Sequence, residues 1–139
     1  MTDQRRRMQI GEVADRTGLS LRTIRHYEDV GLVTPSARSK GGFRLYTEAD
    51  VERLMVVRRM KPLDFSLEEM RDLLDITDRI ADTEDPPSDD ERVRLRERLD
   101  AYRKVADARC ETLRAQLMAA EDFAATLRRR LEAGAGGRA

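Results

Sequence analysis

The most informative stretch of the chain is Ser20-Leu21-Arg22-Thr23-Ile24-Arg25-His26-Tyr27-Glu28. Ser20 is a residue type that caps the start of a helix, because its hydroxyl can accept a hydrogen bond from a free backbone N–H. In the helix that follows, Leu21, Ile24 and Glu28 share one stripe, and we expect Leu21 and Ile24 to face a core. The other faces are free to meet a partner and carry Arg22, Thr23, Arg25 and His26.

A second short helix is predicted immediately upstream. Its stripe consists of Ile10, Val13, Ala14 and Thr17, and Gly18 supplies the turn that ends it. Two short helices joined by a tight turn that contains glycine are typical of a helix-turn-helix, whose second helix lies in the major groove of DNA. The spacing alone leaves another interpretation open, an ordinary corner between two packed helices.

A small β-wing is predicted after the second helix. Gly31-Leu32-Val33-Thr34-Pro35 closes that helix, and further on comes Arg38-Ser39-Lys40-Gly41-Gly42-Phe43-Arg44-Leu45-Tyr46. This stretch is basic, contains a Gly-Gly turn, and alternates Phe43 and Leu45 with Arg44 and Tyr46 in the period of a strand. We therefore expect a hairpin beside the helix-turn-helix.

Taken together, Ile10 to Leu74 resembles the DNA-binding domain of the MerR family of bacterial transcription regulators. The resemblance covers about half of the chain and follows the family's order and spacing. It is carried by Ile10-Gly11-Glu12-Val13-Ala14, by Arg22-Thr23-Ile24-Arg25-His26-Tyr27-Glu28-Asp29-Val30-Gly31-Leu32, by Phe43-Arg44-Leu45-Tyr46-Thr47-Glu48-Ala49-Asp50-Val51, and by Phe65-Ser66-Leu67-Glu68-Glu69-Met70.

The resemblance implies a mainly α protein, in which a winged helix-turn-helix domain with a small β-wing precedes a long coiled-coil dimerisation helix. That helix pairs antiparallel with its copy in a homodimer. The resemblance also implies binding to double-stranded promoter DNA at a palindrome with an over-long spacer. Family members bend and untwist this spacer, so that RNA polymerase can use the promoter once an inducer is bound.

The resemblance also implies which residues contact DNA. In the recognition helix these are Arg22, Thr23, Arg25, His26 and Tyr27, and in the wing it is Arg44. Lys40, in the basic wing stretch, is a further predicted DNA-binding residue. In the family, the Arg and Tyr positions mostly hold phosphates, while early residues of the recognition helix reach bases. This division agrees with the general rule that phosphate contacts fix the register and base contacts give specificity.

Two further helices are predicted from their capping boxes. Thr47-Glu48-Ala49-Asp50 starts one that ends near Met60 and buries Val51, Leu54 and Met55. Ser66-Leu67-Glu68-Glu69 starts another that buries Leu67, Met70, Leu73, Leu74 and Ile80.

The loop Lys61-Pro62-Leu63-Asp64-Phe65 joins these helices, and the family uses it as a second wing. Arg58, Arg59 and Lys61 therefore have two equally weighted roles, contact with phosphate or interaction with the helix dipole. Asp64 departs from the family, where glycine is usual. Aspartate adopts a left-handed turn more readily than most residues, so we expect the fold to be kept. A carboxylate near DNA argues against phosphate contact by this loop.

The C-terminal part is predicted to be one long helix. An acidic stretch containing Pro86-Pro87 indicates a linker, and no Pro or Gly occurs from Ser88 to Ala133. Apolar residues recur every three or four positions with one stutter, as in a coiled coil. This seam comprises Leu95, Leu99, Tyr102, Ala106, Cys110, Leu113, Leu117, Ala120, Ala124, Leu127 and Leu131. A helix of roughly 65–70 Å cannot cover such a seam within its own chain, so we expect a second copy to cover it.

These elements predict four segments. Residues 1–82 form the winged helix-turn-helix domain, 83–87 the linker, 88–133 the dimerisation helix and 134–139 a disordered tail.

Charge is unevenly distributed along a chain whose net charge is zero. Met1 to Tyr46 holds nine Arg and Lys against five Asp and Glu, a net charge of +4, whereas Leu73 to Arg92 has a net charge of −6. The positive charge falls on the predicted helix-turn-helix and wing, as nucleic-acid binding requires. The run Arg5-Arg6-Arg7 is either a phosphate-contacting arm or part of a frayed terminus.

The composition disfavours several other kinds of protein and site. No apolar run reaches the ~18 residues of a membrane span, and no signal region follows the basic start, so we expect a cytoplasmic protein without membrane contact. Cys110 is the only cysteine, and we expect no cofactor and no metal site. For Cys110 we favour packing in the seam, with a redox role and a metal role at the dimer axis as alternatives.

Three other functions compete with that of a transcription regulator. An architectural DNA-bending module, such as an excisionase, shares the winged helix but usually lacks a long dimerisation helix. A coiled-coil adaptor would leave the basic wing unexplained. An enzyme is least favoured, because His26 is the only histidine and the sequence shows no nucleophile–base pair or phosphate loop. The sequence does not identify the inducer, and a small molecule is one candidate.

Overall fold

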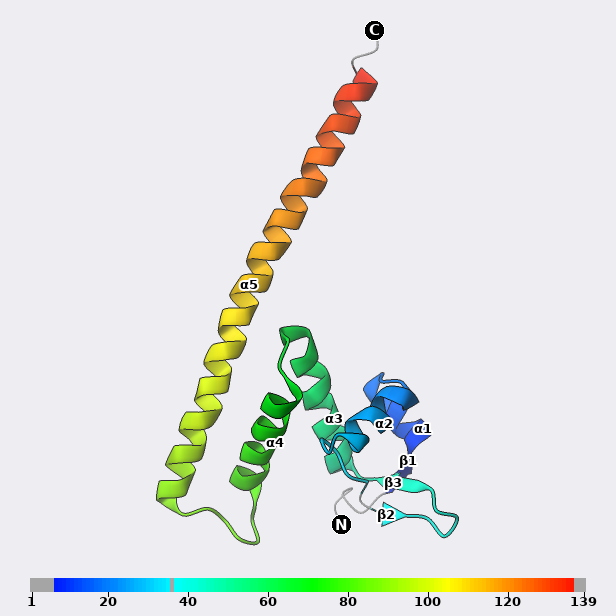
Figure 1. Cartoon of the computed structure of the whole chain (residues 1–139), viewed down its shortest axis with the longest axis vertical. Helices are drawn as coiled ribbons and strands as arrows, with labels where there is room; N and C mark the ends of the chain where they lie inside the picture. The colour runs from blue at the N-terminus through cyan, green and yellow to red at the C-terminus, as the bar shows by residue number, and fades with distance from the viewer. Residues whose placement is uncertain (1–6, 36, 137–139) are drawn as a thin grey trace. The chain divides into compact units, whose positions relative to one another are not determined.

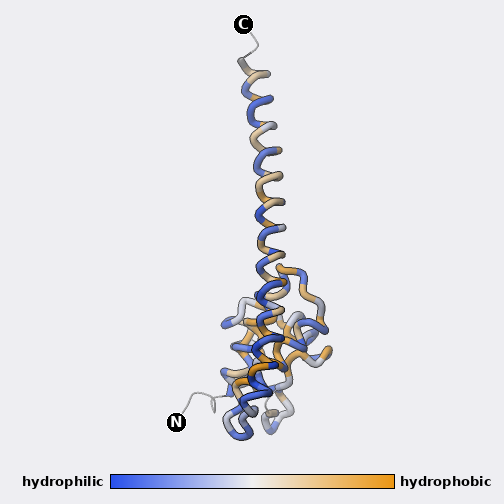
Figure 2. The backbone as a smooth tube through the Cα atoms, turned by 90° about the vertical axis from the view of Figure 1, so that its left-hand side faces the viewer, coloured by the Kyte–Doolittle hydropathy of each residue, from blue (hydrophilic) through white to orange (hydrophobic). Residues whose placement is uncertain are grey.

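The computed structural model describes residues 7–35 and 37–136, and Figure 1 shows the order of their helices and strands. The chain divides into two compact units, of which the first ends at Leu99 and the second starts at Asp100. The fold is mainly α with a small three-stranded sheet and a long C-terminal helix, as predicted. The hydrophobic segments gather in the first unit, whereas hydrophilic and hydrophobic residues alternate along the last helix (Figure 2).

The helix-turn-helix consists of α1 (Ile10–Thr17) and α2 (Leu21–Asp29). Gly18 ends α1 at φ 72°, a left-handed conformation that glycine adopts without steric cost. The Ser20 hydroxyl caps α2 by accepting a hydrogen bond of 3.0 Å from the backbone N–H of Thr23. Both helices, the turn and the cap are therefore confirmed.

The buried face of α2 differs from the predicted stripe. Ile24 and Tyr27 are buried, whereas Leu21 is 41% exposed. The prediction that Leu21 faces the core is thus wrong. At about 100° per residue, Leu21 and Tyr27 lie roughly 60° to either side of Ile24, and the core covers the Tyr27 side.

The wing belongs to an antiparallel sheet of β1 (Met8–Gln9), β2 (Ala37–Arg38) and β3 (Arg44–Tyr46), in the order β1-β3-β2. The register places Met8 opposite Tyr46 and Arg38 opposite Arg44. Tyr46 is fully buried, while Phe43, just before β3, is 63% exposed. The sheet therefore presents the loop between β2 and β3 to solvent.

The N-terminal segment passes directly from a strand into the first helix. β1 ends at Gln9, because Ile10 already begins α1. Of the predicted basic arm, Arg7 is exposed and the two preceding arginines lie outside the described residues.

Helix α3 (Glu48–Met60) begins at the predicted capping box. The carboxylate of Asp50 accepts a 2.8 Å hydrogen bond from the N–H of Thr47, and the Thr47 hydroxyl accepts one of 3.4 Å from the N–H of Asp50. The 3-10 helix η2 (Lys61–Leu63) follows, and Asp64 then adopts the left-handed conformation with φ 62°. The expectation that Asp64 preserves the turn is confirmed.

Helix α4 (Leu67–Ala81) begins at the predicted capping box of Ser66 and Glu69. Its buried residues are Met70, Leu74 and Ile76. The predicted stripe omitted Ile76 and is wrong for Leu67, which is exposed, while Leu73 and Ile80 are only half-buried.

The core of the first unit is assembled mainly from the helices α1 to α4 and the strands β1 and β3. Its largest fully buried side chains include Met8, Val13, Ile24, Leu32, Tyr46, Leu54, Val57 and Ile76. Of the residues predicted to be buried in α3, Val51 and Leu54 are buried and Met55 is half-buried. Arg53 of α3 donates from Nε to the carbonyl of Leu32 at 2.6 Å and from Nη1 to Asp78 at 2.5 Å. These bonds fix the segment after α2 against α3 and α4.

Helix α5 (Asp89–Gly136) has 48 residues, and its first turns belong to the first unit. Arg79 of α4 forms a bidentate ion pair with Glu91, with N–O distances of 2.9 and 3.2 Å, and Leu95 is buried. The helix includes Gly134–Gly136, so the prediction of a disordered tail is wrong for these residues. Residues 137–139 lie outside the described part of the chain.

Candidate nucleic-acid interface

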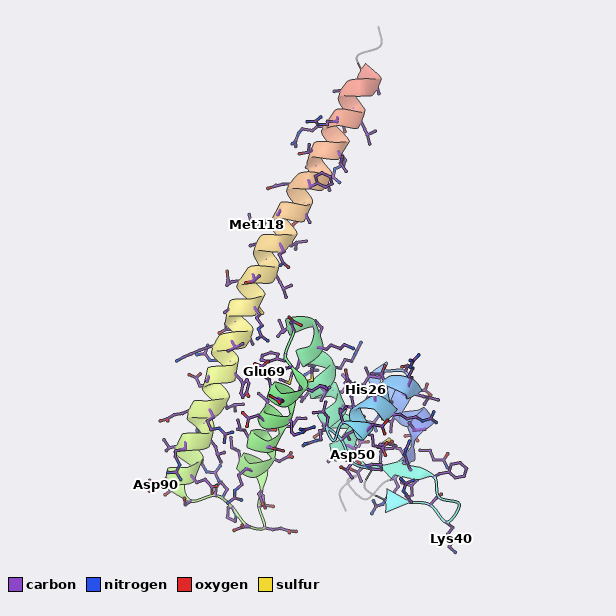
Figure 3. The ribbon with its side chains drawn as sticks, in the orientation of Figure 1. His26, Lys40, Asp50, Glu69, Asp90 and Met118 are labelled. Atoms are coloured by element: carbon purple, nitrogen blue, oxygen red, sulfur yellow. The ribbon has the colours of Figure 1, made fainter. Side chains whose placement is uncertain are left out.

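The exposed surface of α2 carries most of the predicted recognition residues. Arg22, Arg25 and His26 are exposed, and Figure 3 labels His26 on this helix. Thr23 is half-buried, and its Oγ1 accepts a hydrogen bond of 2.8 Å from the Ser20 hydroxyl. The cap at Ser20 thus orients a predicted DNA-contacting side chain as well as starting the helix.

Tyr27 is the exception among the predicted recognition residues. Its side chain is buried at 3% exposure, and within the described residues its hydroxyl has no hydrogen-bond partner. The ring lies at a tilted angle to His26, with 5.9 Å between their centroids. The structure therefore places Tyr27 in the core and does not bring it to the surface that carries Arg22 and His26.

The wing loop is held by its own backbone. The N–H of Ser39 donates to the carbonyl of Phe43 at 2.8 Å, and the N–H of Gly42 donates to the carbonyl of Ser39 at 2.9 Å. Gly42 has φ 83°, which an L side chain rarely adopts. Lys40 is exposed and lies at the end of this loop (Figure 3).

Arg44 is held by Glu28 of the recognition helix. Its Nε lies 2.9 Å from Oε1 of Glu28, an ion pair in which Nε is not aligned for a hydrogen bond. The other carboxylate oxygen accepts a 2.9 Å hydrogen bond from the hydroxyl of Tyr46. Because the Glu28 side chain is only 11% exposed, its carboxylate is largely shielded from water. It fixes β3 against α2.

The hydroxyl of Tyr46 remains protonated in this cluster. Burial raises the pKa of Tyr46, and the hydrogen bond to Glu28 together with the negative charge of that carboxylate raises it further. Tyr46 therefore acts as a hydrogen-bond donor that orients Glu28.

Three arginines from α2 and the wing line one surface hollow of about 200 Å³. Arg25 comes from α2, Arg38 from β2 and Arg44 from β3; Gln9, Ile10, Gly42 and Phe43 complete the lining. We call this site the arginine hollow. Guanidinium groups bind phosphate oxygens through paired hydrogen bonds, so the hollow suits a phosphate of a nucleic-acid backbone.

Arg38 and Phe43 were not among the predicted site residues. Both lie in the wing stretch whose basic and alternating pattern identified the hairpin. The missing information is the register, which places Arg38 opposite Arg44 and so brings both to the hollow.

The second wing keeps both of its predicted roles. Arg58, Arg59, Lys61 and Asp64 are all exposed. The guanidinium of Arg58 lies over Gly18, with its Nη2 3.6 Å from the position that a Cβ at this glycine would occupy. Arg58 therefore lies close to the turn between α1 and α2, whichever role applies.

Residues 7–35 and 37–136 contain no cluster of three or more His, Cys, Asp or Glu suited to a metal ion. Cys110 is a free, half-buried thiol.

None of the described helices combines the length and the apolar character needed to cross a membrane.

The fold and the interface define a winged helix-turn-helix protein. The family model for the "MerR HTH family regulatory protein" matches residues 8–76, and that for "MerR, DNA binding" matches residues 51–132. The chain belongs to the MerR family of DNA-binding transcription regulators. Members of this family are regulators and not enzymes, in agreement with the sequence-based prediction.

Individual relatives support this assignment. The nodulation protein NolA of Bradyrhizobium elkanii is 42% identical over 81 residues, which is 58% of this chain and 37% of NolA. The mercuric resistance operon regulatory protein of Bacillus cereus is 41% identical over 73 residues, 52% of this chain and 55% of that protein. The chain spans only 31% to 37% of the length of the three NolA relatives that it matches.

A solved structure shows the same fold over most of the chain. It is that of HiNmlR, described as a MerR family regulator lacking the sensor domain and bound to promoter DNA. The TM-score is 0.73, and the match covers 94% of this chain and 91% of HiNmlR. At 23% sequence identity, this similarity supports the fold alone.

Proposed function

We propose that this chain is a homodimeric transcription regulator that binds double-stranded promoter DNA in a sequence-specific manner. In this proposal α2 lies in the major groove, where Arg22 and Thr23 reach base edges and His26 contacts the DNA. The wing follows the adjacent backbone, with Lys40 at its tip.

The observation that carries the proposal is the arginine hollow. Arg25 belongs to the recognition helix, while Arg38 and Arg44 belong to the wing, and all three line this hollow. A phosphate bound there would be held from both elements at once, which fixes the register of α2 in its groove. Glu28 supports this arrangement by holding Arg44 while leaving the arginine side chain 32% exposed.

The dimer is supported by the exposed seam of α5. Leu117 is 60% exposed, and the neighbouring seam leucines are exposed as well: Leu113, Leu127 and Leu131. A contiguous apolar stripe of this length is unfavourable in water, and a heptad pattern favours a partner helix. A second copy pairing antiparallel through this seam would also supply two DNA-binding domains for the two halves of a palindrome.

Control of transcription would then follow from deformation of the spacer. A dimer that holds two half-sites in fixed positions bends and untwists the base pairs between them, and the energetic cost depends on their sequence. In the proposed mechanism an inducer changes this deformation, so that RNA polymerase on the same promoter can engage it. The inducer is unidentified; a small molecule is one candidate, and oxidation of Cys110 is another. Such a regulator would act in the cytoplasm.

The test is selection of DNA duplexes from a randomised pool, followed by nuclease footprinting on the recovered sequence. The proposal expects a palindrome, protection of both halves, and altered cleavage at its centre where the spacer is deformed. The double variant Arg25→Ala/Arg44→Ala should lose protection, whereas Val93→Ala, an exposed change on α5 outside the interface and the seam, should retain it. Recovery of no common sequence by the wild type would refute the proposal.

A further inference from the structure

Phe43 is a large apolar side chain that the phosphate contacts leave without a role. Its ring is 63% exposed, yet it lines the arginine hollow together with Arg25, Arg38 and Arg44. We propose that the Phe43 ring packs against the deoxyribose beside the phosphate held in the hollow. This contact increases the DNA affinity by a factor that does not change with salt concentration. This inference rests on the proposed DNA-binding function.

The backbone holds Phe43 in place before any DNA is bound. Its carbonyl accepts a 2.8 Å hydrogen bond from the N–H of Ser39, and its N–H donates to the Ser39 hydroxyl at 3.1 Å. Gly42, with φ 83°, provides the turn that leads into Phe43. Because the backbone at Phe43 is already fixed, contact with a partner costs little further ordering.

The ring lies alongside the loop. A Cβ placed on Gly41 would come within 3.2 Å of Cε2 and 3.4 Å of Cδ2 of Phe43, so the ring rests on this glycine. Apolar side chains that kink DNA act as wedges that enter between base steps. A ring lying on the loop offers its outer face, which suits the surface of a sugar better than the gap between two bases.

The composition of the hollow selects the same partner. The three guanidinium groups favour binding of an anion. The phenyl ring beside them has no hydrogen-bonding group, so it favours contact with apolar surface next to that anion. In a nucleic-acid backbone each phosphate adjoins sugars, which have such surface. Burying roughly 60 Å² of the ring corresponds to about a tenfold gain in affinity for each half-site.

The first experiment measures binding by fluorescence anisotropy at several salt concentrations, on the duplex that the wild type selects from a randomised pool. Phe43→Ala should weaken binding about tenfold per half-site at every salt concentration, with an unchanged slope of log K against log salt. Phe43→Leu should retain most of the affinity, since sugar contact needs apolar area and not an aromatic ring. Val93→Ala removes an exposed apolar side chain on α5 and should change nothing.

The second experiment tests the seat of the ring on Gly41. Gly41→Ala keeps the phenyl ring but displaces it, because the added Cβ would lie only 3.2 Å from its Cε2 atom. This change should lower the DNA affinity, by no more than Phe43→Ala lowers it. In the Phe43→Ala background the same change should have no further effect, because the ring it displaces is absent. Thermal melting of each variant checks that the wing remains folded, as the exposure of Phe43 leads us to expect.

Four results would overturn the inference. Unchanged affinity of Phe43→Ala would show that the ring makes no contact. An equal loss for Phe43→Leu and Phe43→Ala would indicate aromatic insertion between bases, and a lowered melting temperature would assign Phe43 to wing stability. If the wild type itself selects no duplex, the DNA-binding proposal fails first and this inference fails with it.

Discussion

Replacing Arg44 with alanine tests the arginine hollow most directly. Each phosphate contact to duplex DNA contributes about −0.9 to the slope of log K against log salt. The proposed dimer has two hollows, each with one Arg44, and Arg25 and Arg38 share the same phosphate, so Arg44→Ala should make the slope less steep by up to about 1.8. Between about 50 and about 200 mM salt, the variant would then lose up to roughly 12-fold less affinity than the wild type does.

The structure also predicts a side effect of this change. Arg44→Ala removes the cation beside Glu28, whose side chain is only 11% exposed, and the loss of that partner should cost on the order of 1–3 kcal/mol of stability. Binding must therefore be measured well below the melting temperature. Arg44→Lys is the informative second variant, because it keeps a positive charge but lacks the bidentate fork. It should keep the salt slope and lose affinity.

The assay is fluorescence anisotropy on the selected duplex across a salt series. Arg96→Ala is the matched control, since it removes the same charge from an exposed position on α5, outside the hollow. Its slope should equal that of the wild type. An unchanged slope for Arg44→Ala would refute contact between Arg44 and a phosphate in the hollow.

Three further expectations follow from the same structure. Because the pKa of Tyr46 is raised in the folded state, the folded protein keeps the Tyr46 proton at a pH where the unfolded chain loses it. The free energy of unfolding should therefore fall as pH rises above about 10, by up to ~1.4 kcal/mol per pH unit. Chemical unfolding should show this decline to be smaller in Tyr46→Phe; an identical decline in both would contradict it. The double variant Leu113→Glu/Leu117→Glu should sediment as a monomer that no longer binds the operator, and a monomeric wild type at micromolar concentration would end the dimer proposal. Arg22→Ala should change which duplexes are selected, and recovery of the wild-type sequence would exclude base contact by this residue.

The features that could be predicted from the sequence are those with local causes. Ser20, Thr47 and Ser66 each cap a helix through bonds to residues three positions further on, and such bonds need no information about the rest of the fold. The left-handed turn at Asp64 is equally local, because it depends on the residue's own conformational range. The end of α5 was misjudged since glycine weakens a helix without always ending it.

The composition of the arginine hollow required tertiary information. Arg38 and Arg44 are six positions apart in sequence, and only the β2–β3 register places them opposite each other. Arg25 reaches the same hollow because Glu28, one turn further along α2, binds Arg44 and so holds the wing strand against the helix. A basic sequence pattern indicates that the wing meets an anion, but the side chains that share one phosphate depend on this packing.

The aromatic residues show why burial cannot be assigned from side-chain type alone. By polarity, Tyr27 is the better candidate for a surface contact and Leu21 for the core, yet both flank Ile24 at similar angles on a helix of nine residues. A stripe this short fixes the buried direction only to within the 120° or so between them. In the structure Tyr27 is buried in the core, Leu21 is exposed, and Phe43 of the wing is exposed to solvent. A phenyl ring then stands beside three guanidinium groups, where it has no core to enter, and its position is explained by a partner that offers apolar surface next to negative charge.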